Sequence, residues 1–118
     1  MLIMKQTFKT LIIFLLITFK VSAQSPALTI PDFNFFKLDK NLFTNKNLEL
    51  DKMLFFFFFD SDCDHCQHAM MNLNQHYPEY KKAAIYLISL DDEEKMDQFV
   101  DKYGPNLKGK KNVTLLGT

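Results

Sequence analysis

Two cysteines constrain the fold of this chain more than any other feature of its sequence. Cys63 and Cys66 are the only cysteines among the 118 residues, and they have C-x-x-C spacing. They follow an apolar run, Leu54 to Phe59, that ends in five consecutive phenylalanines, and a helical pattern starts at Cys66. A cysteine at the N-terminus of a helix faces free backbone N–H groups, which stabilise its thiolate. The sequence therefore predicts a strand, a redox-active pair and a helix, in that order.

The hydrophobic pattern predicts one α/β domain. The expected elements are strands at 33–38, 42–44, 53–59, 83–90 and 112–116, and helices at 66–77 and 93–103. Because strands alternate with helices, the sheet should contain parallel pairs with helices on its faces. The segment 53–59 is apolar throughout, which is typical of a central strand buried on both faces. Ser61 or Asp62 is expected to cap the helix that follows.

The first 23 residues have the three parts of a secretory signal peptide. Lys5 and Lys9 are basic, residues 11–19 are almost wholly apolar, and residues 21–23 are small at the expected cleavage site. The apolar run is far shorter than the roughly 20 residues that span a bilayer, so no stable membrane anchor is expected after cleavage. We therefore expect a domain of residues 24–118, exported to the periplasm or the extracellular side of the cell envelope.

The charges exclude nucleic acid as a partner. The chain has no arginine, and residues 24–118 contain 11 lysines against 14 acidic residues. A nucleic-acid-binding surface needs a basic patch, and arginine supplies the bidentate phosphate contacts. Neither feature is visible in this sequence.

Export favours disulfides, but a structural role for this pair is the weaker interpretation. A bridge between residues three apart closes a very small loop, which contributes little stabilisation. As a redox pair, Cys63 would attack a substrate disulfide and Cys66 would resolve the mixed disulfide. A protonated His65 would help to stabilise the thiolate, whereas the carboxylates of Asp62 and Asp64 would oppose it.

The segment 55–67, FFFFFDSDCDHCQ, resembles the active-site region of the thioredoxin-like superfamily. It is most similar to exported bacterial thioredoxins of the TlpA/ResA or redoxin type. The resemblance implies a thioredoxin-like sheet with flanking helices, and an N-terminal β-hairpin supplied by residues 33–44. It also implies that Cys63 is the attacking cysteine and Cys66 the resolving one. The function it predicts is an exported thiol–disulfide oxidoreductase acting on protein disulfides.

The same resemblance implies the cofactor and the partners. No cofactor is expected apart from the redox-active disulfide Cys63–Cys66. The expected partners are protein thiols or disulfides and a membrane redox donor.

The sequence departs from the family pattern at several positions. Asp62 stands where many thioredoxins have an aromatic residue, and Phe57 stands where many have a buried acid. The family has a cis-proline loop, two more strands and a last helix after this point, whereas this chain ends at Thr118. We therefore expect a C-terminally truncated domain, in which the strand at 55–59 becomes an exposed edge.

Three other interpretations stay open at this stage. An inactive, truncated thioredoxin-fold remnant would have the same sequence features. A peroxidase would use Ser61 as the hydroxyl beside an attacking cysteine. Copper or zinc handling is suggested by a cluster of soft ligands, although helical spacing turns them in different directions. That cluster comprises Cys63, His65, Cys66, His68, Met70, Met71 and His76.

Overall fold

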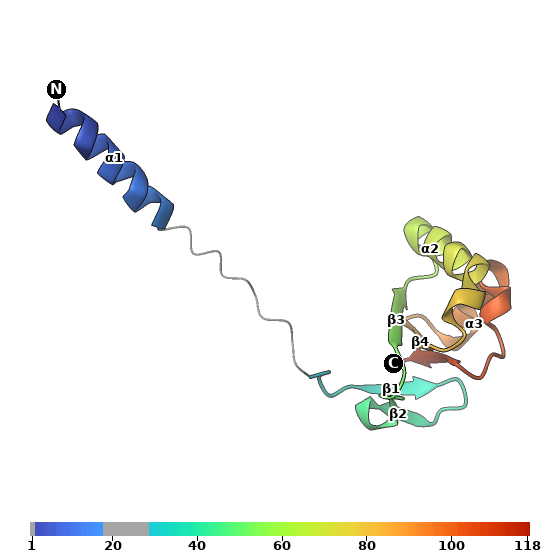
Figure 1. Ribbon diagram of the computed structural model, residues 1–118. Helices are drawn as coiled ribbons and strands as arrows, with labels where there is room; N and C mark the ends of the chain where they lie inside the picture. Colours follow the sequence, from blue (N-terminus) through green and yellow to red (C-terminus); the bar gives the residue numbers. More distant parts are fainter. Residues whose placement is uncertain (1, 18–28) are drawn as a thin grey trace.

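The computed structural model describes residues 2–17 and 29–118. Its helices and strands follow the predicted β-β-β-α-β-α-β order, with one additional helix at the N-terminus (Figure 1). They are α1 (Leu2–Ile17), β1 (Asn34–Lys37), β2 (Leu42–Thr44), β3 (Leu54–Phe59), α2 (Asp64–Gln75), β4 (Ala84–Ser89), α3 (Glu93–Tyr103) and β5 (Val113–Gly117). The expected signal-peptide cleavage site at 21–23 lies outside the described residues.

The five strands form one mixed sheet in the order β2-β1-β5-β4-β3. β4 is parallel to β3 and to β5, as strands joined by helical crossovers should be. β1 is antiparallel to both β2 and β5, which confirms the predicted N-terminal hairpin. The α/β class and the thioredoxin-like arrangement of sheet and helices are therefore confirmed.

β4, and not β3, is the strand buried on both faces. All six residues of β4 are buried, whereas β3 has one buried residue, Phe59, and Phe58 is 67% exposed. The prediction of a central strand at 53–59 was wrong because β3 pairs only with β4 among the described strands, which leaves it at the edge of the sheet. This is the edge position expected from the family resemblance.

The helices α2 and α3 cover one face of the sheet (Figure 1). Their buried side chains pack on alternate residues of β3 and β4, and the rings of Phe59 and Phe99 stack with centroids 4.6 Å apart. Burial of each such large side chain stabilises the fold by about 1.5–3 kcal/mol. The helix expected at 66–77 instead runs from Asp64 to Gln75, and its Met70 and Leu73 are buried in this layer, together with Tyr77 of the short 3-10 helix that follows it.

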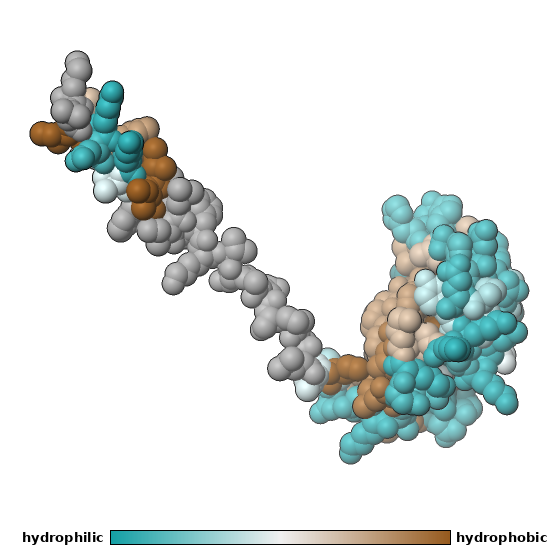
Figure 2. Space-filling view, viewed as in Figure 1, coloured by the Kyte–Doolittle hydropathy of each residue, from teal (hydrophilic) through white to brown (hydrophobic). Residues whose placement is uncertain are grey.

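The opposite face of the sheet is covered in part by the N-terminal hairpin. Phe43 of β2 packs on Tyr86 of β4, and Phe56 stacks on the same tyrosine ring from β3. Figure 2 shows apolar side chains gathered at the surface on the β3 side of the domain. The sheet is thus well covered at β4 and more exposed towards β3.

Candidate functional site: the Cys63–Cys66 dithiol

Cys63 lies at the junction between β3 and α2, at the carboxyl end of the sheet. A turn closes just before it, because its backbone N–H donates to the carbonyl of Asp60 at 3.1 Å. The helix begins at Asp64, so Cys63 itself is the N-cap, with extended backbone angles. The prediction of Ser61 or Asp62 as the cap was wrong, because this turn occupies both residues and delays the start of the helix.

The two sulfur-bearing residues interact directly. The backbone N–H of Cys66 donates to the sulfur of Cys63, with a distance of 3.3 Å between nitrogen and sulfur. Cys63 thus takes the place of the oxygen-bearing residue that usually satisfies the first N–H groups of a helix. Both cysteines are free thiols and half-buried, and Cys66 also packs against the core beneath α2.

The environment separates the acidities of the two thiols. A hydrogen bond from the Cys66 side chain is the main cause that lowers the pKa of Cys63, and the backbone N–H groups of Cys66 and His65 add to it. The same side-chain bond raises the pKa of Cys66, because ionisation of this thiol would remove the donor. The carboxylate of Asp60 raises the pKa of both cysteines. The geometry therefore favours the thiolate on Cys63.

The site differs from the sequence prediction in its acidic neighbours. Asp62 and Asp64 were expected to oppose the thiolate, but both side chains are exposed, and the carboxylate that acts on the sulfurs is that of Asp60. The side chain of His65 is also exposed on the first turn of α2, beside Cys63 in the chain. Its proposed tuning role is therefore still a prediction.

Sequence reasoning missed Asp91, which lies just beyond the end of β4. Its carboxylate accepts a hydrogen bond from the backbone N–H of Ser61 at 2.8 Å, and this contact is the main cause that lowers the pKa of Asp91. The sequence did not single out Asp91 as a candidate site residue. A signal was available, since adjacent parallel strands end at the same edge, and Phe59 lies opposite Ser89 in the register.

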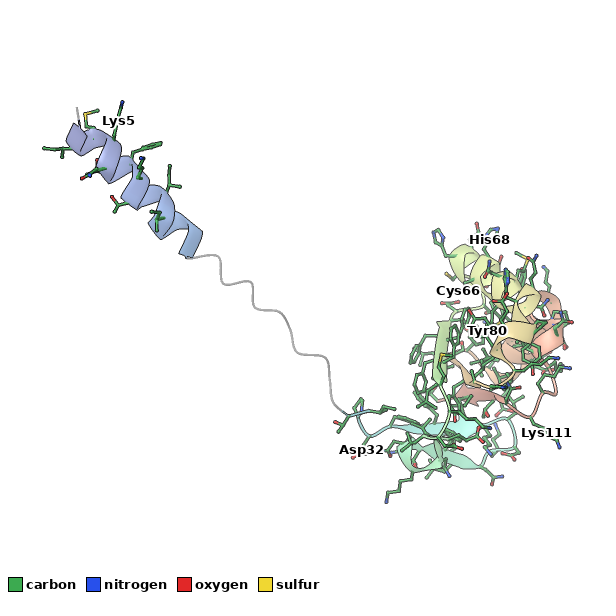
Figure 3. The ribbon with its side chains drawn as sticks, viewed as in Figure 1. Lys5, Asp32, Cys66, His68, Tyr80 and Lys111 are labelled. Carbon is green, nitrogen blue, oxygen red and sulfur yellow. The ribbon has the colours of Figure 1, made fainter. Side chains whose placement is uncertain are left out.

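The soft ligands near the cysteines do not converge on the two sulfurs. His68 hydrogen-bonds within α2, to the carbonyl of Asp64, and Met70 is fully buried in the core. His68 lies on α2 farther from the sheet than Cys66 does (Figure 3). Over residues 2–17 and 29–118, no three His, Cys, Asp or Glu side chains are arranged to hold a metal ion. His76, at the far end of α2, pairs instead with Glu79.

The sheet order, the crossover helices and a dithiol at the start of α2 define a protein with the thioredoxin-like fold of thiol–disulfide oxidoreductases. The chain belongs to the AhpC/TSA family, whose model matches residues 26–116. No curated protein matches its sequence.

Solved structures share this fold. A secreted Mycobacterium tuberculosis disulfide oxidoreductase homologous to E. coli DsbE is 24% identical, with a TM-score of 0.57 over 72% of this chain and 59% of that chain. DsbF from MTB is 26% identical, with a TM-score of 0.58 over 75% of this chain and 64% of that chain. Copper-bound yeast Sco1 is 21% identical, with a TM-score of 0.59 over 75% of this chain and 51% of that chain. This chain thus spans less than two thirds of the length of each.

Proposed function

We propose that the protein is an exported thiol–disulfide oxidoreductase that acts on protein disulfides through Cys63 and Cys66. The observation that supports this most strongly is the opposite perturbation of the two thiols at the helix N-terminus. A pair that served only as a structural bridge would have no need for contacts that lower the pKa of one thiol and raise the pKa of the other. Such separated pKa values are typical of groups with distinct chemical roles.

In the proposed reaction, the Cys63 thiolate attacks one sulfur of a substrate disulfide. A new bond forms between Cys63 and that sulfur, the substrate S–S bond breaks, and the leaving thiolate takes up a proton. Cys66 then loses its proton and attacks the sulfur of Cys63. The mixed disulfide breaks, the second substrate thiol leaves, and two electrons have passed from the dithiol to the substrate. The reverse sequence oxidises a substrate dithiol.

His65 is proposed as a tuning residue for the Cys63 thiolate. Its backbone N–H already lowers the pKa of Cys63, and its exposed ring follows in the first turn of α2. A protonated imidazole there would add positive charge near the thiolate. The expected result for His65→Gln is slower Cys63 alkylation below neutral pH and an unchanged rate at alkaline pH, because an imidazole is uncharged at alkaline pH and glutamine carries no charge at any pH.

Export rests on the N-terminal sequence and on similarity. The basic start, the apolar run and the small residues at 21–23 support cleavage after Ala23. The similar disulfide oxidoreductase from M. tuberculosis is a secreted protein. Of the helices that the structure describes, none has the length and hydrophobicity to cross a bilayer. Mass spectrometry of the protein from cell-envelope fractions tests this proposal, which predicts a chain that begins at Gln24.

The redox-active disulfide is the proposed cofactor, and a membrane redox donor is the proposed partner that reduces it again. An insulin-type disulfide reduction assay tests the activity, with the Cys63→Ser/Cys66→Ser double variant as the control. We expect the wild-type protein to catalyse insulin reduction and the double variant not to catalyse it. Equal rates for the folded wild-type protein and the folded double variant would instead support an inactive member of the fold.

A further inference from the structure

The loop that precedes Cys63 is held from two sides at one residue, Ser61. The backbone N–H of Ser61 donates to the Asp91 carboxylate at 2.8 Å. Its backbone carbonyl accepts a hydrogen bond from the side-chain amide of Gln67, in α2, at 3.2 Å. Ser61 is thus bonded both to the segment that follows β4 and to the helix that bears the dithiol. Its position fixes where the chain enters the turn that leads to Cys63.

Asp91 is itself held in the frame of the sheet. The hydroxyl of Ser89 donates to the Asp91 carboxylate at 3.2 Å, and the backbone N–H of Asp91 donates back to that hydroxyl at 3.1 Å. Ser89 is the last residue of β4, is 2% exposed and lies opposite Phe59 in the parallel register. The carboxylate therefore has a fixed place relative to the end of β3, where the loop begins.

We propose that Asp91 is a positioning residue for the dithiol. The Asp91 carboxylate holds the loop at Ser61, so that the Cys63 sulfur stays at the first turn of α2. Only the effect of Asp91 on the rate of disulfide reduction rests on the proposed function. The positioning itself concerns the thiolate and can be measured without any substrate.

The sign of the effect separates positioning from simple electrostatics. A carboxylate near a thiol opposes thiolate formation, so loss of its charge alone would make Cys63 more acidic. Loss of the tether frees Ser61, and the sulfur then loses its alignment with the N–H groups of Cys66 and His65, which makes Cys63 less acidic. Two other charged residues act on Asp91 and on Cys63. Lys95 lies near the Asp91 carboxylate, and Asp60 lies near the Cys63 sulfur.

The experiment measures the pH dependence of Cys63 alkylation by iodoacetamide in the reduced full-length protein, with peptide mass spectrometry to separate the two cysteines. For Asp91→Ala we expect an upward shift of the midpoint and alkylation slower by about three- to tenfold near neutral pH, the size of one lost hydrogen bond. Asp91→Asn keeps an acceptor oxygen and should restore most of the rate. A downward or absent shift in folded Asp91→Ala would overturn the proposal.

Asp62→Ala is the matched control for charge. It removes an exposed carboxylate from the same loop, and that side chain makes no hydrogen bond within the described residues. We expect a small downward shift or none for this variant. If Asp62→Ala and Asp91→Ala gave the same shift, Asp91 would act only through its charge, and positioning would be rejected.

A second measurement covers the case in which Asp91→Ala does not fold. The amide proton of Ser61 should exchange slowly with solvent in the wild-type protein and in Asp91→Asn, because both offer it an acceptor. Rapid exchange in the folded wild-type protein would overturn the proposal by itself. Failure of insulin reduction together with the expected alkylation shifts would reject the proposed activity and leave the positioning role standing.

Discussion

The backbone N–H of Cys66 donates to the sulfur of Cys63 across 3.3 Å, so the helix that bears the second thiol is capped by the first. Capping and acidity are thereby linked in one contact. A thiolate accepts this hydrogen bond more strongly than a thiol does, which favours ionisation of Cys63. The start of α2 and the reactivity of the site depend on the same geometry.

The Cys66 side chain should contribute to Cys63 acidity separately from the Cys66 backbone. Cys66→Ala removes the side-chain donor, which is the main cause of the lowered pKa of Cys63, and leaves the backbone N–H in place. We expect the midpoint of Cys63 alkylation to rise. Cys66→Ser keeps a hydroxyl donor and should lie closer to the wild-type protein, so equal midpoints for Ala and Ser would contradict this prediction.

The ionised form of Asp91 should stabilise the fold in a definite pH window. The folded state lowers the pKa of Asp91, so its contribution is fully present above the ordinary aspartate value of about 4 and is lost as the pH falls through the lowered value. Asp91→Asn cannot titrate there. We therefore expect a smaller loss of unfolding free energy between about pH 5 and pH 2 in the variant than in the wild-type protein, measured by urea denaturation.

For this comparison, Asp51→Asn is a suitable control. Asp51 is exposed, and none of the hydrogen bonds or ion pairs within the described residues involves its carboxylate. Its replacement should leave the acid dependence of stability close to that of the wild-type protein. An identical acid dependence in Asp91→Asn would contradict the assigned shift.

The phenylalanine-rich edge should promote self-association. Phe58 is 67% exposed on β3, which has one strand partner within the described residues. A lysine on an edge strand opposes pairing with another chain. We expect Phe58→Lys to reduce concentration-dependent light scattering and to change the unfolding free energy by no more than about 0.5 kcal/mol.

The neighbouring residue provides the contrast for this test. Phe59 is buried and stacks on Phe99, so Phe59→Lys places a charge in the core and should unfold the domain. If Phe58→Lys were equally destabilising, Phe58 would be a core residue and not part of an exposed edge.

Gly104 should not tolerate a side chain. A Cβ atom there would lie 2.9 Å from the sulfur of Met70, which is fully buried, and 3.2 Å from Leu107. Overpacking of this kind costs about 1–3 kcal/mol. We expect Gly104→Ala to lower the unfolding free energy by that amount in a denaturant titration. The double variant Gly104→Ala/Met70→Ala should show non-additive losses, whereas strict additivity would mean that the two sites do not touch.

Much of the fold could be predicted from local patterns. The helix at 93–103 has the predicted bounds, because Asp92 caps its start and Gly104 follows its end. The order of strands and helices was also predictable from apolar spacing and turn residues, and the N-terminal hairpin was implied by the family resemblance. The burial of β3 was not, since a wholly apolar run does not tell whether a strand has one neighbour or two.

The site was only partly predictable. The C-x-x-C spacing located the dithiol, and the strand and helix patterns placed it at their junction. The capping role of Cys63 depends on the turn closed by Asp60, and the Asp91–Ser61 contact depends on the register between β3 and β4. The first is a local turn that the residue types did not indicate, and the second is a tertiary contact that depends on how the two strands pair.

The tether to Asp91 also affects how the protein is made. During synthesis from the N-terminus, Cys63 and Cys66 emerge before β4 and Asp91 do. Until β4 pairs with β3, the Asp91 carboxylate is not in place to hold Ser61. If Asp91 positions the dithiol as proposed, we expect the newly made chain to be less prone to disulfide exchange, and Cys63 to reach its full reactivity only once the sheet is complete.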